Sequence, residues 1–142
     1  MRYQRPKKGE VISNEFSLGT HQAKIESVIN KPSKKGSKMF RLNLVGNNGE
    51  KGMYFLVFGN DYTEKNLTYI LVSIEDNGVD IPDMKFGHNR STLEFLEGKD
   101  VYIRVEEKPF NGEVKPTVTE FLALDEFEEN EVSDDLFDDD DF

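Results

Sequence analysis

Basic side chains gather in the first part of this 142-residue chain. Residues 1–41 hold ten Lys or Arg residues against three acidic ones, although the whole chain carries a net charge of −10. Half of these cations cluster in and just after one polar segment: Lys31, Lys34, Lys35, Lys38 and Arg41. Clustered cations attract polyanions, and nucleic acid is a common partner of this kind. The cluster therefore predicts a phosphate-binding surface, with a solvated basic face as the alternative.

Aromatic residues are interleaved with basic ones farther along the chain. The aromatic candidates are Tyr54, Phe58, Tyr102 and Phe110, and the basic ones near them are Arg104, Lys108 and Lys115. Flat rings can stack on any base, for about 1–3 kcal/mol each, while cations hold the phosphates. Val101 and Ile103 are expected to face the core, so Tyr102 between them is expected to face outward. Phe40 and Phe55 fit the core better.

The last 18 residues are strongly acidic. Residues 125–142 hold 11 acidic and no basic side chains, which leaves 17 acidic and 18 basic ones in residues 1–124. Like charges at this density repel and cannot pack into a core, so a disordered tail is expected. The final residues are the predicted partner-binding site, because a ring and a carboxylate could enter one basic pocket: Asp138, Asp139, Asp140, Asp141 and Phe142. A tail that serves solubility alone is the alternative.

Signals for catalysis, cofactors or metals are weak throughout the sequence. The chain has no cysteine, and its two histidines, His21 and His88, stand in no ligand or triad spacing. A phosphate-cradling GxxxxGK loop is missing too. We therefore predict no catalytic residue, no cofactor and no metal. With neither an apolar stretch of about 18 residues nor a secretory signal, a cytoplasmic protein without membrane contact is expected.

Two periodicities in the sequence predict the elements that position these side chains. Apolar and polar residues alternate, or apolar runs occur, at five predicted strands: residues 21–26, 40–45, 51–58, 101–105 and 113–124. The apolar run within residues 51–58 hides which face each side chain takes. A helical spacing of i, i+3, i+4 and i+7 joins Leu67, Ile70, Leu71 and Ile74, between the third and fourth strands.

Capping residues mark the ends of the predicted helix. Asp61 followed by Glu64 resembles a capping arrangement at its start, and residues 77–78 (NG) provide a stop. Ser91 and Glu94 are expected to cap one short helical turn before the fourth strand. Residues 79–90 before this turn are expected to form a loop, and Gly98 closes the turn.

This order of elements predicts a mainly β fold: a five-stranded OB-fold barrel with one helix between strands three and four, followed by a disordered acidic C-terminal tail. A small open α+β sheet is the alternative fold. The expected divisions are a flexible N-terminal arm (1–17), the OB-fold domain (18–124) and the tail (125–142). In such a domain the loop between strands one and two, here the lysine-rich residues 31–38, borders the binding groove.

The chain resembles bacteriophage single-stranded-DNA-binding proteins over roughly its whole length. The resemblance lies in residues 19–25 (GTHQAKI), residues 34–37 (KKGS) and the Asp-rich ending on Phe142. Bacterial members have Ile-Pro before the final Phe, and this chain does not. The resemblance implies that the protein coats single-stranded DNA in an infected bacterial cell, and that its tail competes with DNA for the groove. It also implies that the tail recruits a polymerase, helicase, primase or recombinase.

The predicted function is therefore sequence-independent binding of single-stranded DNA in phage replication or recombination, with no bond made or broken. Two other functions remain open. One is an acidic-tailed interaction protein that mimics DNA and binds basic partners, and the other is an RNA-binding OB module. The oligomeric state is also open, with a homodimer or a higher oligomer possible.

Overall fold

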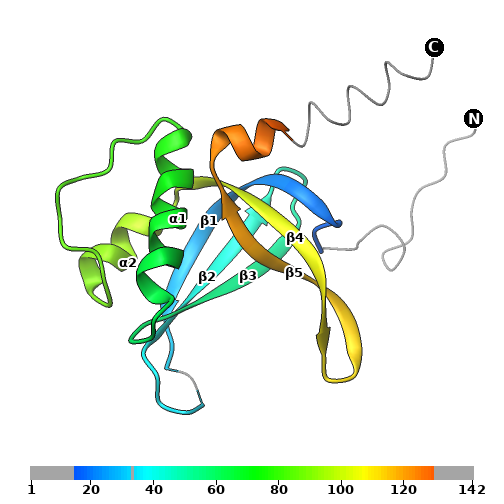
Figure 1. Cartoon of the computed structure of the whole chain (residues 1–142), viewed down its shortest axis with the longest axis horizontal. Helices are drawn as coiled ribbons and strands as arrows, with labels where there is room; N and C mark the ends of the chain where they lie inside the picture. Colours follow the sequence, from blue (N-terminus) through cyan, green and yellow to red (C-terminus); the bar gives the residue numbers. More distant parts are fainter. Residues whose placement is uncertain (1–14, 33, 130–142) are drawn as a thin grey trace, which may run out of the picture.

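Five antiparallel strands form one sheet with helices packed against it (Figure 1). A computed structural model describes residues 15–32 and 34–129. The strands are paired in the order β3-β2-β1-β4-β5. The elements along the chain are β1 (Gly19–Asn30), β2 (Met39–Gly46), β3 (Lys51–Val57), α1 (Thr63–Asp76), α2 (Arg90–Leu96), β4 (Asp100–Phe110) and β5 (Glu113–Leu122). The prediction of a mainly β domain with five antiparallel strands is confirmed.

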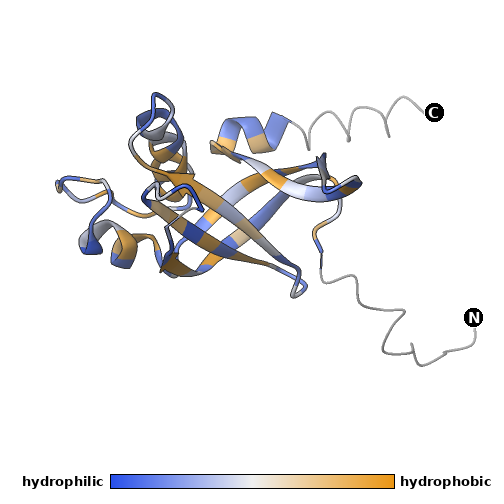
Figure 2. Ribbon diagram, turned by 90° about the horizontal axis from the view of Figure 1, so that it is seen from below, coloured by the Kyte–Doolittle hydropathy of each residue, from blue (hydrophilic) through white to orange (hydrophobic). Residues whose placement is uncertain are grey.

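Alternation along β2 explains how the sheet forms its core. Phe40, Leu42 and Leu44 are buried, whereas the residues between them face the other side. Residues opposite each other in an antiparallel pair point to the same side, so Leu56 of β3, opposite Phe40, shares this inner face. Figure 2 shows the resulting bands of hydrophobic and hydrophilic residues along the strands. Burial of this face is the main force that holds the sheet together.

The two edge strands, β3 and β5, approach each other through side chains. The rings of Tyr54 on β3 and Phe121 on β5 meet edge to face with centroids 4.9 Å apart. A Cβ placed on Gly52 would lie 3.1 Å from the Phe16 ring and 3.4 Å from Val118. Among the described residues the paired sheet runs from β3 to β5 without a ladder between those two edges. The five-stranded sheet is therefore confirmed, and its closure into a barrel stays a prediction.

The predicted helix is present as α1, with Leu67, Ile70 and Ile74 buried. Its end at Asn77 and Gly78 is confirmed, since Gly78 has a φ of 93° in the left-handed region. The expected capping by Asp61 is wrong. Tyr62 is the N-cap and caps nothing with its side chain.

A second helix, α2, also lies between β3 and β4, so the prediction of one helix there is wrong. Its N-cap is Asn89, whose Oδ1 accepts a hydrogen bond of 2.8 Å from the Thr92 N–H, so Ser91 and Glu94 do not cap it as expected. Thr92 and Leu96 are buried, which gives this short helix an inner side against β1. Seven residues offer too little periodicity to distinguish a helix from a turn in sequence.

The folded part of the chain continues beyond the predicted domain boundary at Leu124. Residues 124–129 form a helical turn beside the C-terminal end of α1 (Figure 1). Phe127 is only 6% exposed and stacks on Tyr102, with ring centroids 4.6 Å apart and planes 18° from parallel. The Leu124 N–H donates to Asp76 Oδ2 at 2.8 Å. Residues 125–129 therefore belong to the domain, and the rest of the predicted tail lies outside the described residues.

Candidate nucleic-acid interface

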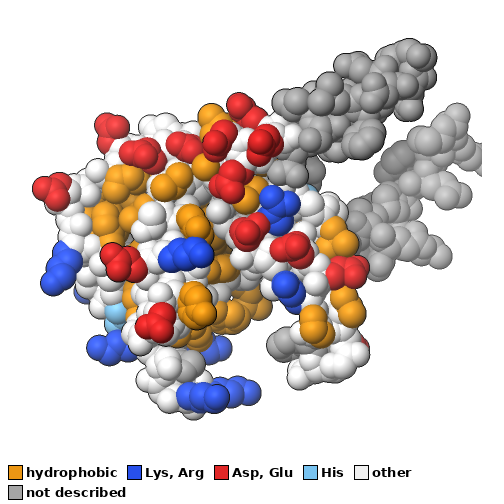
Figure 3. Space-filling view, viewed as in Figure 1, with side chains coloured by type: hydrophobic (Ala, Val, Ile, Leu, Met, Phe, Trp, Pro, Cys, Tyr) orange, Lys and Arg blue, Asp and Glu red, His pale blue; other side chains and the backbone are white. Residues whose placement is uncertain are grey.

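The lysine-rich segment forms the loop between β1 and β2. Its ends are fixed by backbone hydrogen bonds, from Lys31 N–H to the Met39 carbonyl at 3.0 Å and from Phe58 N–H to the Lys38 carbonyl at 2.9 Å. The four lysine side chains are exposed: Lys31, Lys34, Lys35 and Lys38. Figure 3 shows the blue side chains of this loop at the lower edge of the molecule. The sheet thus presents a group of cations at one end, as the sequence predicted.

An apolar and cationic surface lies on the sheet face opposite the core. Strand register places Ile29 of β1 opposite Arg41 of β2, and Arg41 opposite Phe55 of β3, so all three side chains share this side. Met53 lies two residues from Phe55 and on the same side. Exposed fractions are 46% for Phe55 and 51% for Met53, high values for large apolar residues. We call these four residues, Ile29, Arg41, Met53 and Phe55, the outer face.

Arg41 lies at the centre of the outer face in an unusual environment. Its side chain is half-buried, and its Nε is the one buried side-chain nitrogen or oxygen within the described residues that lacks a hydrogen-bond partner. An unpaired buried N–H group costs free energy. The protein encloses this Nε, so a ligand on the surface would be held by the rest of the planar guanidinium, whose geometry matches a phosphate. The position therefore favours an anionic ligand on the outer face.

A groove of about 550 Å³ adjoins the outer face, between β3 and the β4–β5 hairpin. Figure 3 shows the surface hollowed between this hairpin and the lysine-rich loop. We call it the hairpin groove, and its lining combines rings with cations: Phe16, Lys51, Met53, Tyr54, Phe55, Lys108 and Lys115 among others. Lys51 is paired with Glu26 at 3.2 Å. Met53 and Phe55 belong to both surfaces, so the groove and the outer face form one continuous site.

Two lysines of the hairpin groove stand directly opposite each other. Lys108 on β4 pairs with Lys115 on β5 in the strand register, and both side chains are exposed. Like charges in this arrangement destabilise a strand pair. An anion held between them would relieve the repulsion, which fits the phosphate-binding role predicted for both residues.

Two predicted stacking residues are buried instead. Phe58 is 9% exposed and packs edge to face on Phe40, with ring centroids 4.9 Å apart. Tyr102 does point away from Val101 and Ile103, but Phe127 covers its ring and leaves it 7% exposed. The predicted direction of Tyr102 is therefore confirmed, but its expected exposure for stacking on bases is wrong, because a segment distant in sequence forms a second layer over β4.

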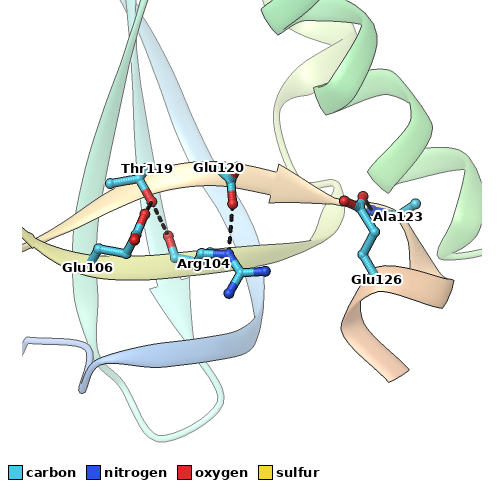
Figure 4. Close-up of polar contacts among 6 residues, drawn as sticks. All are labelled: Arg104, Glu106, Thr119, Glu120, Ala123 and Glu126. Carbon is cyan, nitrogen blue, oxygen red and sulfur yellow. Dashed lines mark hydrogen bonds and ion pairs between the residues drawn. The ribbon is translucent and has the colours of Figure 1, made fainter. Parts of the chain in front are cut away.

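The remaining predicted residues take different places. Tyr54 is half-buried on the wall of the hairpin groove, and this burial raises the pKa of its phenol above the usual value of 10.0. Arg104 lies outside the groove lining and pairs through Nε with Glu120 Oε2 at 2.7 Å (Figure 4). Phe110 belongs to β4, but its side chain lies outside what the structure describes. The same holds for the predicted partner-binding residues: Asp138, Asp139, Asp140, Asp141 and Phe142.

Sequence reasoning missed Ile29, Lys51, Met53 and Phe55. From the sequence Phe55 is expected in the core, and residues 53–58 are all apolar with no period of two that would reveal its face. A signal was nonetheless present in the neighbouring strand. Since Phe40, Leu42 and Leu44 face inward, the register with β3 leaves Phe55 outside.

Other types of site receive no support from the structure. Within residues 15–32 and 34–129, no group of three or more His, Asp or Glu side chains could hold a metal ion. No helix in the described part of the chain is long and apolar enough to cross a membrane.

Comparison of the chain with models of protein families and with curated protein sequences finds no match. The case for the candidate site therefore rests on its own geometry.

Proposed function

We propose that this protein binds single-stranded DNA without sequence preference, as the bacteriophage proteins it resembles do. One observation carries the proposal: the outer face, with exposed Phe55 beside Arg41, runs without a break into the lysine-lined hairpin groove. Unpaired bases expose ring faces, whereas a duplex hides them between its stacked pairs. A surface that offers a free ring among cations therefore suits a single strand better than a duplex.

The strand order supports an OB-fold as the framework of this site. Strand β1 pairs with both β2 and β4, and the edges β3 and β5 meet through the Tyr54 and Phe121 rings. An OB-fold is a partly open five-stranded barrel that binds oligonucleotides on strands two and three and on the loops after strands one and four. The outer face, the lysine-rich loop and the β4–β5 hairpin correspond to these three parts.

The mechanism is stoichiometric binding. Phe55 stacks on a base, while Met53 and Ile29 supply apolar contact beside it. The lysines of the loop and of the hairpin groove hold phosphates on either side, so affinity falls as salt displaces these contacts. The bound strand is kept open for replication or recombination in the cytoplasm of an infected bacterium.

The acidic residues 130–142 complete the proposed function as a recruiting segment. Their charge and the terminal Phe142 suit a basic pocket of a replication or recombination protein, such as a polymerase, helicase, primase or recombinase. The same segment competes with DNA for the hairpin groove at low salt. Removal of residues 134–142 should therefore tighten strand binding in dilute buffer and abolish recruitment, and unchanged affinity would refute the competition.

Fluorescence anisotropy with labelled oligothymidine tests the proposal. Replacing Phe55 with Ala should raise the Kd by roughly 5-fold to 150-fold, because a stacked base contributes about 1–3 kcal/mol. Phe55→Tyr keeps the ring and should stay within about threefold of the wild type. Leu18→Ala is the matched control, since Leu18 is 52% exposed and lies outside the site.

Two results would refute the proposal: equal affinity for a duplex of the same length, or an unchanged Kd for Phe55→Ala. The same titration with oligouridine separates an RNA-binding module from a DNA-binding one. If the protein bound a basic protein but did not bind oligothymidine, the DNA-mimic alternative would be favoured.

A further inference from the structure

A second hollow, which shares Tyr54 with the hairpin groove, has a different chemistry. It measures about 290 Å³ and lies between α1 and β5. We call it the tyrosine pocket, and its lining includes Tyr54, Tyr62, Lys65, Tyr69, Glu120 and Glu126. Small-molecule sites usually occupy roughly 300–1,000 Å³. The tyrosine pocket is thus of a size for one long side chain.

Aromatic rings are the main apolar surface of this pocket. Tyr62 is 67% exposed and Tyr69 is 48% exposed, so neither ring is used by the core. Lys65 already places its Nζ over the Tyr69 ring, 5.8 Å from the centroid. The face of an aromatic ring carries partial negative charge and attracts cations. The chain itself therefore shows that a cation is accepted at this surface.

Carboxylates form another part of the lining and are held in place. Glu120 is fixed by Arg104, and Glu126 Oε1 accepts a hydrogen bond of 2.9 Å from the Ala123 N–H (Figure 4). A carboxylate can accept about four hydrogen bonds, so the contact with Arg104 does not exhaust Glu120. The helical turn 124–129, which contributes Glu126 to the pocket, carries three further exposed acids: Asp125, Glu128 and Glu129. Figure 3 shows acidic side chains gathered over this upper part of the molecule.

This charge distribution distinguishes the pocket from the hairpin groove. Its lining has two glutamates against one lysine, whereas the groove has three lysines against Glu15. Arg104 offsets the charge of Glu120, and Glu26 offsets that of Lys51. Glu126 and Lys65 then balance in the pocket lining, whereas Lys108 and Lys115 outweigh Glu15 in the groove. A phosphate backbone is therefore attracted to the groove and not to the pocket, whose rings and carboxylates suit a cation.

We propose that the tyrosine pocket binds an arginine side chain from a basic segment of a partner protein. The planar guanidinium stacks on a tyrosine ring and donates in a fork to a carboxylate, so it uses both kinds of lining at once. An ammonium group lacks both the planar face that stacks on a ring and the fork that binds a carboxylate at two points. Since the pocket and the hairpin groove have only Tyr54 in common, the partner can bind while a strand is held.

NMR of the full chain with ¹³C-labelled tyrosine rings tests this inference. The probe is acetyl-Gly-Arg-Gly-Arg-Gly-amide, and the control is the same peptide with citrulline, which is isosteric but uncharged, in place of arginine. The ring signals of Tyr62 and Tyr69 should shift and saturate with the arginine peptide. Tyr102, buried beneath Phe127, should not move. The citrulline peptide should bind at least about tenfold more weakly, because it loses the charge-assisted hydrogen bonds.

Variants assign the binding to the rings and the carboxylates. Tyr69→Ala and Glu126→Gln should each weaken the arginine peptide at least about fivefold, and Tyr69→Phe should bind as the wild type does. The amide introduced by Glu126→Gln still offers a carbonyl oxygen to the Ala123 N–H, so this hydrogen bond can be kept. Unmoved Tyr62 and Tyr69 signals, or equal binding of the citrulline peptide, would overturn the inference. Oligothymidine affinity is measured on the same samples. Loss of peptide binding with unchanged oligothymidine affinity would therefore refute the arginine site without refuting the proposed strand binding.

Discussion

Phe127 should stabilise the domain although it lies in the acidic segment of the chain. Phe→Ala substitutions at buried positions cost about 3–5 kcal/mol. Here the cluster is small, comprising Tyr102, Leu122 and Leu124 beside Phe127. In the variant, residues 124–129 are free to fray, and the conformational entropy they regain offsets part of the loss. We therefore expect Phe127→Ala to lower the free energy of unfolding by about 2 kcal/mol.

Urea denaturation followed by circular dichroism measures this change. In a thermal melt the same loss of about 2 kcal/mol should lower the Tm by roughly 8 °C for a domain of this size. Leu18→Ala removes apolar volume from an exposed position and should change stability by less than about 0.5 kcal/mol. If Phe127→Ala were as mild as this control, the helical turn 124–129 would not be packed on Tyr102, and our placement of the boundary would be wrong.

Three further predictions concern the hairpin groove and its surroundings. Replacing Lys108 and Lys115 together with Ala should lower the slope of log K against log salt by about 1.4 for single strands, since each phosphate contact contributes roughly 0.7; an unchanged slope would remove both from the site. Burial raises the pKa of Tyr54, so above about pH 10 the unfolded state loses this proton first and the free energy of unfolding falls. Tyr54→Phe has no such proton, so urea titrations should show a smaller fall in its free energy of unfolding between about pH 9 and 11. Gly52→Ala should destabilise by about 1–3 kcal/mol, because the new Cβ crowds the Phe16 ring, and a neutral effect would show that the ring moves freely.

Periodicity predicted the elements whose two faces differ. In β2 the inward Phe40, Leu42 and Leu44 alternate with residues that face the other side. In α1 the apolar residues are spaced so that they form one stripe on the buried side of the helix. These patterns are local, so sequence alone contains them. In and just after β3, the six consecutive apolar residues 53–58 conceal the direction of each side chain, so the sequence does not show that Phe55 faces outward. The register with β2, a non-local property, decides its face.

The errors at Tyr102 and at the tail boundary have one physical cause. Alternation correctly turns Tyr102 away from the core, but it cannot show that Phe127, distant in sequence, covers the ring. Conversely, charge density predicted a disordered segment from residue 125 onward, yet residues 124–129 form a helical turn, held by the Phe127–Tyr102 stack and by the Leu124 N–H bond to Asp76. Contacts between residues distant in sequence decide both cases.

The position of the bound strand is tested most directly by an amide NMR titration of the full chain with unlabelled oligothymidine. Signals of the outer face and of the β4–β5 hairpin should shift, with the largest changes near Phe55 and Arg41, while those of α1 stay in place. Shifts confined to α1 and the helical turn 124–129, or no shifts in dilute buffer, would contradict single-strand binding by this surface.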